Sequence, residues 1–347
     1  MKRTRLLLLS LAFSAALSAH ATHDALAQNS KAPAPSDPRA ASTPQRPGTP
    51  PAEEEDEVVP VSTSLVNVTV SVLDREGRFV PRLAKDDFRV YDNGVEQRVA
   101  HFSPVERPFT VFLMLDTSES TLFRLSDMQE AAVAFVEQLR PQDRVMVVSF
   151  SNVFSIKSYA TDDREVLREA IRRTTTGGGT SLYPAVDYIL KHLVRTVPGR
   201  KAVVLFTDGA DSAAVNNLDG PGRATFESTL HDAEETEALI YPISYDTLPS
   251  MLARHQPRHH EKILKSFKRA GQYLEGLAGR TGGQVFRADS LTDLRAAFTR
   301  VAEVLRWQYS LGFYPSHAPA GGEQRRLKVG VTRPDLAVRS RDSYVRR

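Results

Sequence analysis

The sequence predicts an α/β fold in which a doubly wound, mainly parallel sheet is inserted between two halves of a small antiparallel β-sandwich. Through the middle of the chain, apolar runs of strand length alternate with segments of helical periodicity. Such alternation indicates a parallel sheet with both faces covered. Short strands with period-two alternation precede and follow this region. Because neither flanking set is large enough to be stable alone, we expect the two sets to pair.

The composition of the chain argues against nucleic-acid binding and against sites that depend on Cys. The chain has 347 residues, of which 41% are hydrophobic and 25% charged, as in an ordinary globular protein. The formal net charge of +3 gives no electrostatic argument for nucleic-acid binding, and no RNA-binding, zinc-finger or P-loop pattern occurs. The chain has no Cys, which excludes disulfides and thiolate metal sites.

Residues 1–27 have the layout of a cleaved export signal. Three basic residues precede an apolar run and two small-residue sites: Lys2, Arg3 and Arg5, then residues 6–18, then 19–21 and 25–27. An uncleaved N-terminal anchor is the alternative. No later stretch is long and apolar enough to span a membrane. We therefore expect an exported protein that is periplasmic, at the cell surface or secreted, with no membrane span after signal cleavage.

The next two segments differ sharply in composition. Residues 28–57 are rich in Pro, Ala, Ser and acidic residues, which predicts a disordered tether whose acidic end is a solvating spacer. Residues 58–106 form the N-terminal β unit. There, valines alternate with polar residues from Val66 to Val72, and Asp92-Asn93-Gly94 predicts a tight hairpin after a second strand.

Residues 107–308 are expected to form the α/β domain. Its first strand, Phe109–Leu115, is a continuous apolar run of the fully buried type that ends at Asp116. Helical periodicity follows over Met128–Leu139 and stops at Pro141. The later strands and helices are expected at Arg144–Phe150, Asp163–Arg173, Leu182–Val194, Lys201–Thr207, Leu239–Tyr245, part of Leu252–Ala278, Gly283–Arg287 and Ser290–Trp307.

Residues 309–347 return to short strands, which we expect to pair with residues 58–106. The strands are predicted at Tyr309–Tyr314, Arg326–Val331 and Leu336–Arg341. The basic residues of this segment are interpreted as a solvated strand face: Arg325, Arg326, Lys328, Arg339, Arg341, Arg346 and Arg347.

Three polar segments of the α/β region carry the candidate site. Asp116–Ser120 and Thr207–Gly209 each follow a predicted buried strand, and Gly177–Ser181 precedes a predicted helix. In a doubly wound sheet, ligands bind beyond the carboxyl ends of strands where the strand order reverses. Carboxylate and hydroxyl oxygens select a hard cation, so the sequence predicts a site for Mg²⁺, or for Mn²⁺ or Ca²⁺.

These segments closely resemble the von Willebrand factor type A family and its metal-ion-dependent adhesion site. The family pattern is D-x-S-x-S, then a Thr in a Gly-rich loop, then an Asp that begins a D-G turn. The matching residues are Asp116, Ser118, Ser120, Thr180 and Asp208. The resemblance covers roughly residues 109–307 and implies a Rossmann-like fold.

The resemblance also implies roles for these residues. Ser118 and Ser120 would bind the metal directly, whereas Asp116 and Asp208 would act largely through water and hydrogen bonds. Thr180 would bind directly or through water. Neutral hydroxyls leave the cation under-neutralised, so an Asp or Glu of a partner protein can complete its coordination. The implied function is metal-dependent protein binding or adhesion, without enzymatic activity.

Other interpretations stay open at this point. Asp116 and Asp208 could cap helices or tighten turns, and the metal could merely stabilise an envelope scaffold. A metal-dependent hydrolase is less well supported. A haloacid-dehalogenase-type site requires a second Asp two residues after the nucleophile, where this chain has Ser118, and Ser118 has no G-x-S-x-G context.

A histidine group offers a weaker candidate site. His255, His259 and His260 could bind a transition metal. Because no carboxylate pattern accompanies them, we interpret this stretch as a solvated loop.

Overall fold

The computed structural model describes residues 65–76, 78–104, 108–120, 125–212, 223–316 and 323–345. All of them belong to one compact unit, Val59–Arg347. The expected signal, residues 1–27, and the expected tether, residues 28–57, lie outside the described residues. No helix in the described ranges is both long enough and apolar enough to span a membrane.

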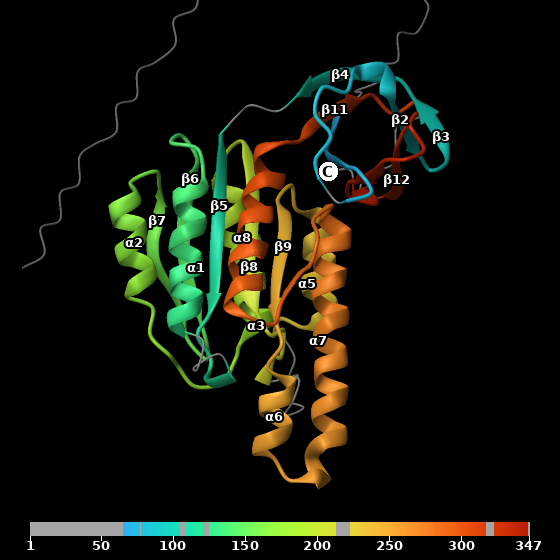
Figure 1. Cartoon of the computed structure of the whole chain (residues 1–347). Helices are drawn as coiled ribbons and strands as arrows, with labels where there is room; N and C mark the ends of the chain where they lie inside the picture. Colours follow the sequence, from blue (N-terminus) through green and yellow to red (C-terminus); the bar gives the residue numbers. More distant parts are fainter. Residues whose placement is uncertain are drawn as a thin grey trace, which may run out of the picture. The chain divides into compact units, whose positions relative to one another are not determined.

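A six-stranded sheet forms the centre of the α/β region (Figure 1). Its strands are β5 (Phe109–Asp116), β6 (Arg144–Phe150), β7 (Phe154–Thr161), β8 (Arg200–Thr207), β9 (Leu239–Tyr245) and β10 (Phe286–Ala288). Their order is β10-β9-β8-β5-β6-β7, and only β7 is antiparallel to its neighbour. The chain leaves β5 towards β6 and later returns to β8 on the other side. The carboxyl ends of β5 and β8 therefore form the switch point of the sheet.

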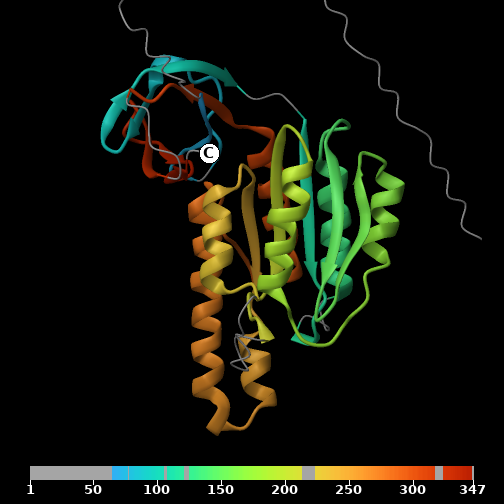
Figure 2. The same ribbon diagram turned by 180° about the vertical axis from the view of Figure 1, so that it is seen from behind.

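Helices cover both faces of this sheet, as predicted (Figure 2). One face packs against α1 (Leu125–Gln138), α2 (Arg164–Arg172) and α8 (Leu291–Arg306). The other face packs against α3 (Leu182–Tyr188), which continues into η3 (Ile189–Leu193) and η4 (Val194–Thr196), and against α5 (Phe226–Glu235) and α7 (His260–Thr281). Between β9 and α7 lie α6 (Leu248–Arg254) and η5 (Pro257–His259).

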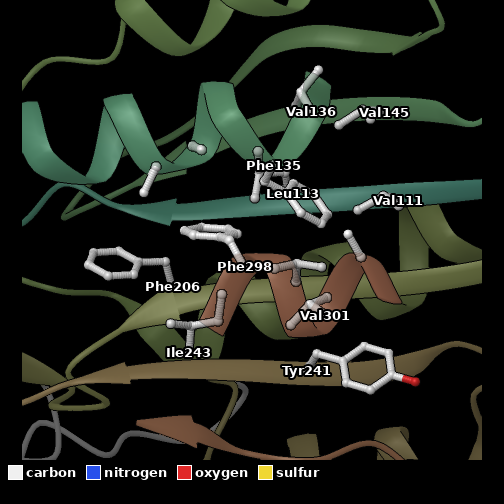
Figure 3. Packing of buried hydrophobic residues seen from close by; sticks show 14 of the residues in the cluster. Val111, Leu113, Phe135, Val136, Val145, Phe206, Tyr241, Ile243, Phe298 and Val301 are labelled. Carbon is white, nitrogen blue, oxygen red and sulfur yellow. The ribbon is translucent and has the colours of Figure 1, made fainter. Parts of the chain in front are cut away.

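Strand β5 explains why the sequence at its position is apolar without alternation. All of its residues are buried because helices cover both faces. On one face, Leu113 lies near Phe135 of α1 and Phe298 of α8, whose ring centroids are 5.3 Å apart (Figure 3). Burial of each such side chain contributes about 1.5–3 kcal/mol. This packing holds the carboxyl end of β5, and hence Asp116, in a rigid frame.

Two four-stranded antiparallel sheets make up the flanking sandwich. The first has the order β13-β1-β11-β4, from Ala337–Arg339, Val66–Leu73, Tyr309–Phe313 and Val99–Pro104. The second has the order β14-β12-β2-β3, from Ser343–Val345, Gln324–Val331, Phe88–Asp92 and Val95–Gln97, with η1 (Lys85–Asp87) just before β2. N-terminal and C-terminal strands alternate in both sheets and share one apolar core. The predicted insertion of the α/β region between two halves of a sandwich is confirmed.

The structure also differs from the sequence predictions. The edge strand β7, helix α5 and strand β14 were not expected. The interpretation of the basic C-terminal residues as a solvated face is wrong for Arg325, whose side chain is only 11% exposed. Its Nε lies 2.9 Å from Asp92 Oδ1, so the guanidinium neutralises a fully buried carboxylate of β2.

Candidate metal centre

Three loops meet at the carboxyl ends of β5 and β8. The Asp116–Ser120 loop contacts the Gly-rich loop through two backbone hydrogen bonds: Gly177 N donates to Thr117 O at 2.8 Å, and Glu119 N donates to Gly178 O at 3.2 Å. The Gly-rich loop also contacts the segment after β8. Thr180 N donates to Ser212 Oγ at 2.7 Å, and Ser212 N donates back to Thr180 O at 2.9 Å. The structure thus brings the three sequence segments together.

The glycines of the middle loop allow this close approach. A Cβ on Gly177 would lie 2.1 Å from Ser151 Oγ, and one on Gly179 would lie 2.7 Å from Ser212 Oγ. Neither position has room for a side chain. The Gly-rich loop is therefore a packing requirement of the site, which is a use of glycine where backbones come close.

The five motif residues lie in a largely buried group. Asp116 is 0% exposed, Ser118 1%, Asp208 4% and Thr180 6%, whereas Ser120 is half-buried. Ser118 Oγ and Ser120 Oγ are 3.0 Å apart. Glu119, between them, is exposed. Successive side chains therefore alternate in direction after β5: the hydroxyls of Ser118 and Ser120 face inward, and the carboxylate of Glu119 faces outward.

Hydroxyl and N–H groups orient both carboxylates. Asp116 Oδ1 accepts from Ser118 N at 3.0 Å, and its Oδ2 accepts from Thr207 Oγ1 at 2.6 Å. Asp208 Oδ2 accepts from Thr247 Oγ1 at 2.7 Å. Sequence reasoning missed Thr207 and Thr247. The available signal was their position, because each stands at or just past the carboxyl end of a strand next to the motif.

Electrostatics at this edge favours an added positive charge. Burial raises the pKa of Asp116 to about 7, and the nearby Asp208 carboxylate adds to this shift. Burial raises the pKa of Asp208 as well, against the opposing effect of hydrogen bonds from Thr247 and Ser120. A cation bound beside such carboxylates would reverse the shifts. The all-oxygen donor set and its excess of buried negative charge fit a hard divalent cation.

A third buried acid, Asp211, lies close to the motif and was also missed. It is 2% exposed, and its Oδ2 accepts from Tyr183 N in the first turn of α3 at 3.2 Å. Its position three residues after Asp208 was the available signal. Within the described residues, no group of three or more His, Cys, Asp or Glu side chains is arranged to hold a metal. A metal here would therefore depend on the hydroxyls as well as the two carboxylates.

The histidine candidates are not gathered into a metal site. His260 Nε2 lies 3.0 Å from both Leu252 O and His255 O, and His255 Nδ1 lies 2.8 Å from Met251 O. These contacts tie the turn between α6 and α7, which gives His255 and His260 a structural role.

Residues 111–210, which contain all five motif residues, match the family model of the von Willebrand factor type A domain. The chain carries a von Willebrand factor type A domain. The matched residues run from β5 to the turn after β8, so the family pattern and the observed switch point coincide. The match does not include the strands of the sandwich, which lie before residue 111 and after residue 210.

Several known proteins are similar to this chain. A UPF0353 protein of Mycolicibacterium gilvum is 26% identical over 214 residues, which cover 57% of this chain and 61% of the relative. The vWF domain of the type V pili tip protein Mfa5 from Porphyromonas gingivalis is 16% identical, with a TM-score of 0.45, over 58% of this chain and 96% of that one. Proximal thread matrix protein 1 from the mussel byssus, in a structure with a zinc-occupied MIDAS motif, is 16% identical, with a TM-score of 0.42. The match covers 61% of this chain and 49% of that one.

Proposed function

We propose that this domain is an exported, metal-dependent protein-binding module that captures a partner's Asp or Glu side chain. One observation carries the proposal: two buried carboxylates with raised pKa values lie beside inward-facing hydroxyls at the switch point of the sheet. Such an arrangement is unfavourable without a cation. A bound Mg²⁺, Mn²⁺ or Ca²⁺ would supply a positive centre that a partner carboxylate can approach.

The chain's own residues divide this task. Ser118, Ser120 and Thr180 would hold the cation through neutral oxygens, so that positive charge is left for the partner. Asp116 and Asp208 would balance part of the charge from behind. Thr207 and Thr247 position these two carboxylates through hydrogen bonds of 2.6 and 2.7 Å. Partners of this kind strongly influence metal affinity in proteins.

A hydrolase is the weaker proposal. Neither Ser118 nor Ser120, whose Oγ atoms are 3.0 Å apart, lies in the G-x-S-x-G turn that presents a catalytic Ser. Asp116 accepts hydrogen bonds at both oxygens and is fully buried, which does not suit a nucleophile. Phosphatase or protease activity that required Asp116 would overturn the binding proposal.

Calorimetric titration of Mg²⁺ and Mn²⁺ tests the metal centre directly. The protein from Gln28 onward should bind saturably, and Asp116→Ala should abolish binding. Thr207→Val and Thr247→Val, which remove one hydroxyl each, should weaken binding roughly 10–100-fold. Asp211→Asn is the matched control, because Asp211 is buried close by but its described hydrogen bond is to α3. If Asp211→Asn and Asp116→Ala had equal effects, a general structural cause would replace the proposed site.

The proposal also includes export of the protein from the cytoplasm. It rests on the basic, apolar and small-residue order of residues 1–27. Fractionation of cells that express the tagged full chain should place it outside the cytoplasm. Deletion of residues 2–27 should retain it in the cytoplasm, and an unchanged distribution would contradict the export signal.

The alternative to protein binding is a structural scaffold in which the metal only stabilises the domain. A protein that binds metal and becomes more stable, but has no affinity for carboxylate ligands, would favour this alternative.

A further inference from the structure

The helical hairpin of α6 and α7 carries a concentration of positive charge. Between Asp246 and Arg269 there are six Lys or Arg residues and only two acidic ones, whereas the whole chain has a formal net charge of +3. All six basic side chains are exposed: Arg254, Arg258, Lys262, Lys265, Lys268 and Arg269.

This hairpin is attached directly to the candidate metal centre. Thr247, which donates to Asp208 Oδ2, is the residue from which α6 begins. The Gly209 turn that follows Asp208 lies against α7, where an added Cβ would be 3.1 Å from Ala270 Cβ. The part of α7 before Ala270 extends past the carboxyl edge of the sheet in both views (Figures 1 and 2). At roughly 1.5 Å of rise per residue, Lys262 is about 12 Å along the helix from that turn.

The apolar side of the hairpin is partly buried, whereas its basic side is exposed to solvent. Ile263 and Phe267 are half-buried at helical spacing, while Lys262, Lys265 and Arg269 recur on the opposite face. The histidine contacts described above fix the turn. The basic residues are therefore held by a defined scaffold.

Part of the positive charge is available for a partner. Lys265 pairs with Glu261 at 2.7 Å, and Arg269 is 3.5 Å from Glu227. Lys262 and Lys268 make no ion pair with another described residue. Leu264, which is 49% exposed, lies beside Lys265 and one turn from Lys268, so the patch has a small apolar centre.

We propose that this basic hairpin is a second contact surface for an acidic polypeptide whose carboxylate occupies the metal centre. The inference rests on the proposed function and extends it from one carboxylate to a run of acidic residues. A separation of about 12 Å is spanned by roughly four extended residues and is close to the Debye length of about 8–10 Å. Lys262, Lys265 and Lys268 would steer and hold the acidic segment while the metal fixes one side chain.

The exposed chemistry favours a polypeptide over the other anionic partners. Binding of single-stranded nucleic acid normally uses exposed aromatic side chains for stacking, but Phe267 and Tyr273, the Phe and Tyr residues of α7, are half-buried and buried, respectively. An amphipathic membrane helix needs a broad apolar face, whereas Leu264 is the large apolar side chain that α7 exposes within the described residues.

Two synthetic peptides test the proposal on the mature chain with Mg²⁺. One has eight consecutive Glu residues, and the other has a single Glu in a Gly-Ser peptide of equal length. The variant Lys262→Ala/Lys265→Ala/Lys268→Ala should bind the eight-Glu peptide about tenfold or more weakly, yet bind the single-Glu peptide within about twofold of the unaltered chain. Its Mg²⁺ titration should be unchanged. Arg172→Ala/Arg173→Ala/Arg287→Ala removes three exposed charges elsewhere and is the matched control.

The outcomes separate this inference from the proposed function. If Mg²⁺ binds but the single-Glu peptide does not, carboxylate capture fails, and Mg²⁺-independent binding of the eight-Glu peptide would overturn the joint surface. If the single-Glu peptide binds and the Lys variant binds both peptides normally, only the basic surface is wrong. Tighter, Lys-dependent binding to vesicles of anionic phospholipid or to an oligonucleotide would also overturn the acidic polypeptide as the partner.

Discussion

Two aspartates in different parts of the molecule are equally buried but differ in how their charge is balanced. Asp92 in the sandwich and Asp116 in the α/β domain are both 0% exposed. Asp92 accepts from Arg325 Nε at 2.9 and 3.0 Å and from the Tyr344 hydroxyl at 3.2 Å. Asp116 accepts from a hydroxyl and a backbone N–H, and it lies near the second carboxylate Asp208.

The difference separates a structural carboxylate from a candidate binding carboxylate. The sandwich supplies its own cation to Asp92, so the ion pair joins the N-terminal strand β2 to the C-terminal strand β12 without any external group. The carboxyl edge of the central sheet instead concentrates negative charge, which raises the pKa of Asp116 to about 7. A buried carboxylate beside a second carboxylate is the electrostatic arrangement that favours an external cation.

Breaking the Asp92 pair tests the first half of this comparison and should have the largest effect. Arg325→Ala leaves a buried carboxylate without its cation, which typically lowers the free energy of unfolding by about 3–5 kcal/mol. Urea denaturation followed by circular dichroism measures the change. The double variant Asp92→Asn/Arg325→Met, which removes both charges, should recover much of the loss. A single-variant loss below about 1 kcal/mol would show that solvent already screens this pair.

The pH dependence of the metal-free protein tests the second half. The pKa of Asp116 is raised from 3.8 in a model peptide to about 7 in the fold, so the folded state binds its proton more tightly than the unfolded state. The favourable contribution of the protonated group is complete below about pH 4 and is lost as the pH rises towards 7. In EDTA, the free energy of unfolding should fall over this window by on the order of a few kcal/mol.

Asp116→Asn isolates this effect from other titrating groups. The variant cannot ionise at this position, so the difference in stability between it and the unaltered chain should grow from about pH 4 to about pH 7. Excess Mg²⁺ should reduce the pH dependence of the unaltered chain, because a bound cation favours the charged carboxylate. Equal pH profiles for the two proteins in EDTA would mean that the Asp116 carboxylate is already compensated inside the fold.

The same two regions show what the sequence alone could predict. The apolar runs of β5 and β8 were sufficient to place the Asp116 and Asp208 loops at one edge of a parallel sheet, because strand direction follows from strand–helix alternation. The Gly177–Gly179 loop, which follows no predicted strand, was assigned to the site only through the resemblance to the von Willebrand factor type A family. The Asp92–Arg325 pair could not be predicted in this way. Its members are 233 residues apart in sequence, and a basic residue in a short strand has the same local pattern whether it faces solvent or a buried carboxylate. Thr207 and Thr247 were missed for a related reason, since a hydroxyl acquires its role only from its neighbours in space.

The smallest expected change in stability comes from the packing of the Gly-rich loop at the metal edge, by which we mean the carboxyl edge of the central sheet that holds the candidate metal centre. Gly177→Ala would place a Cβ 2.1 Å from Ser151 Oγ, so the loop or Ser151 has to move, at a typical cost of about 1–3 kcal/mol. Gly178→Ala is the matched control in the same loop, because its Cβ would be 3.4 Å from Asn152 Nδ2, at the end of a side chain that can adjust. Because Gly177 N also binds Thr117 O beside the motif, Gly177→Ala should weaken Mg²⁺ binding as well as lower the melting temperature. Thermal melts and Mg²⁺ titration of the two variants measure both effects. Equal Mg²⁺ affinity in the two variants would show that the metal edge tolerates a shift of the Gly-rich loop, and that balance of charge rather than precise loop packing distinguishes it from the sandwich.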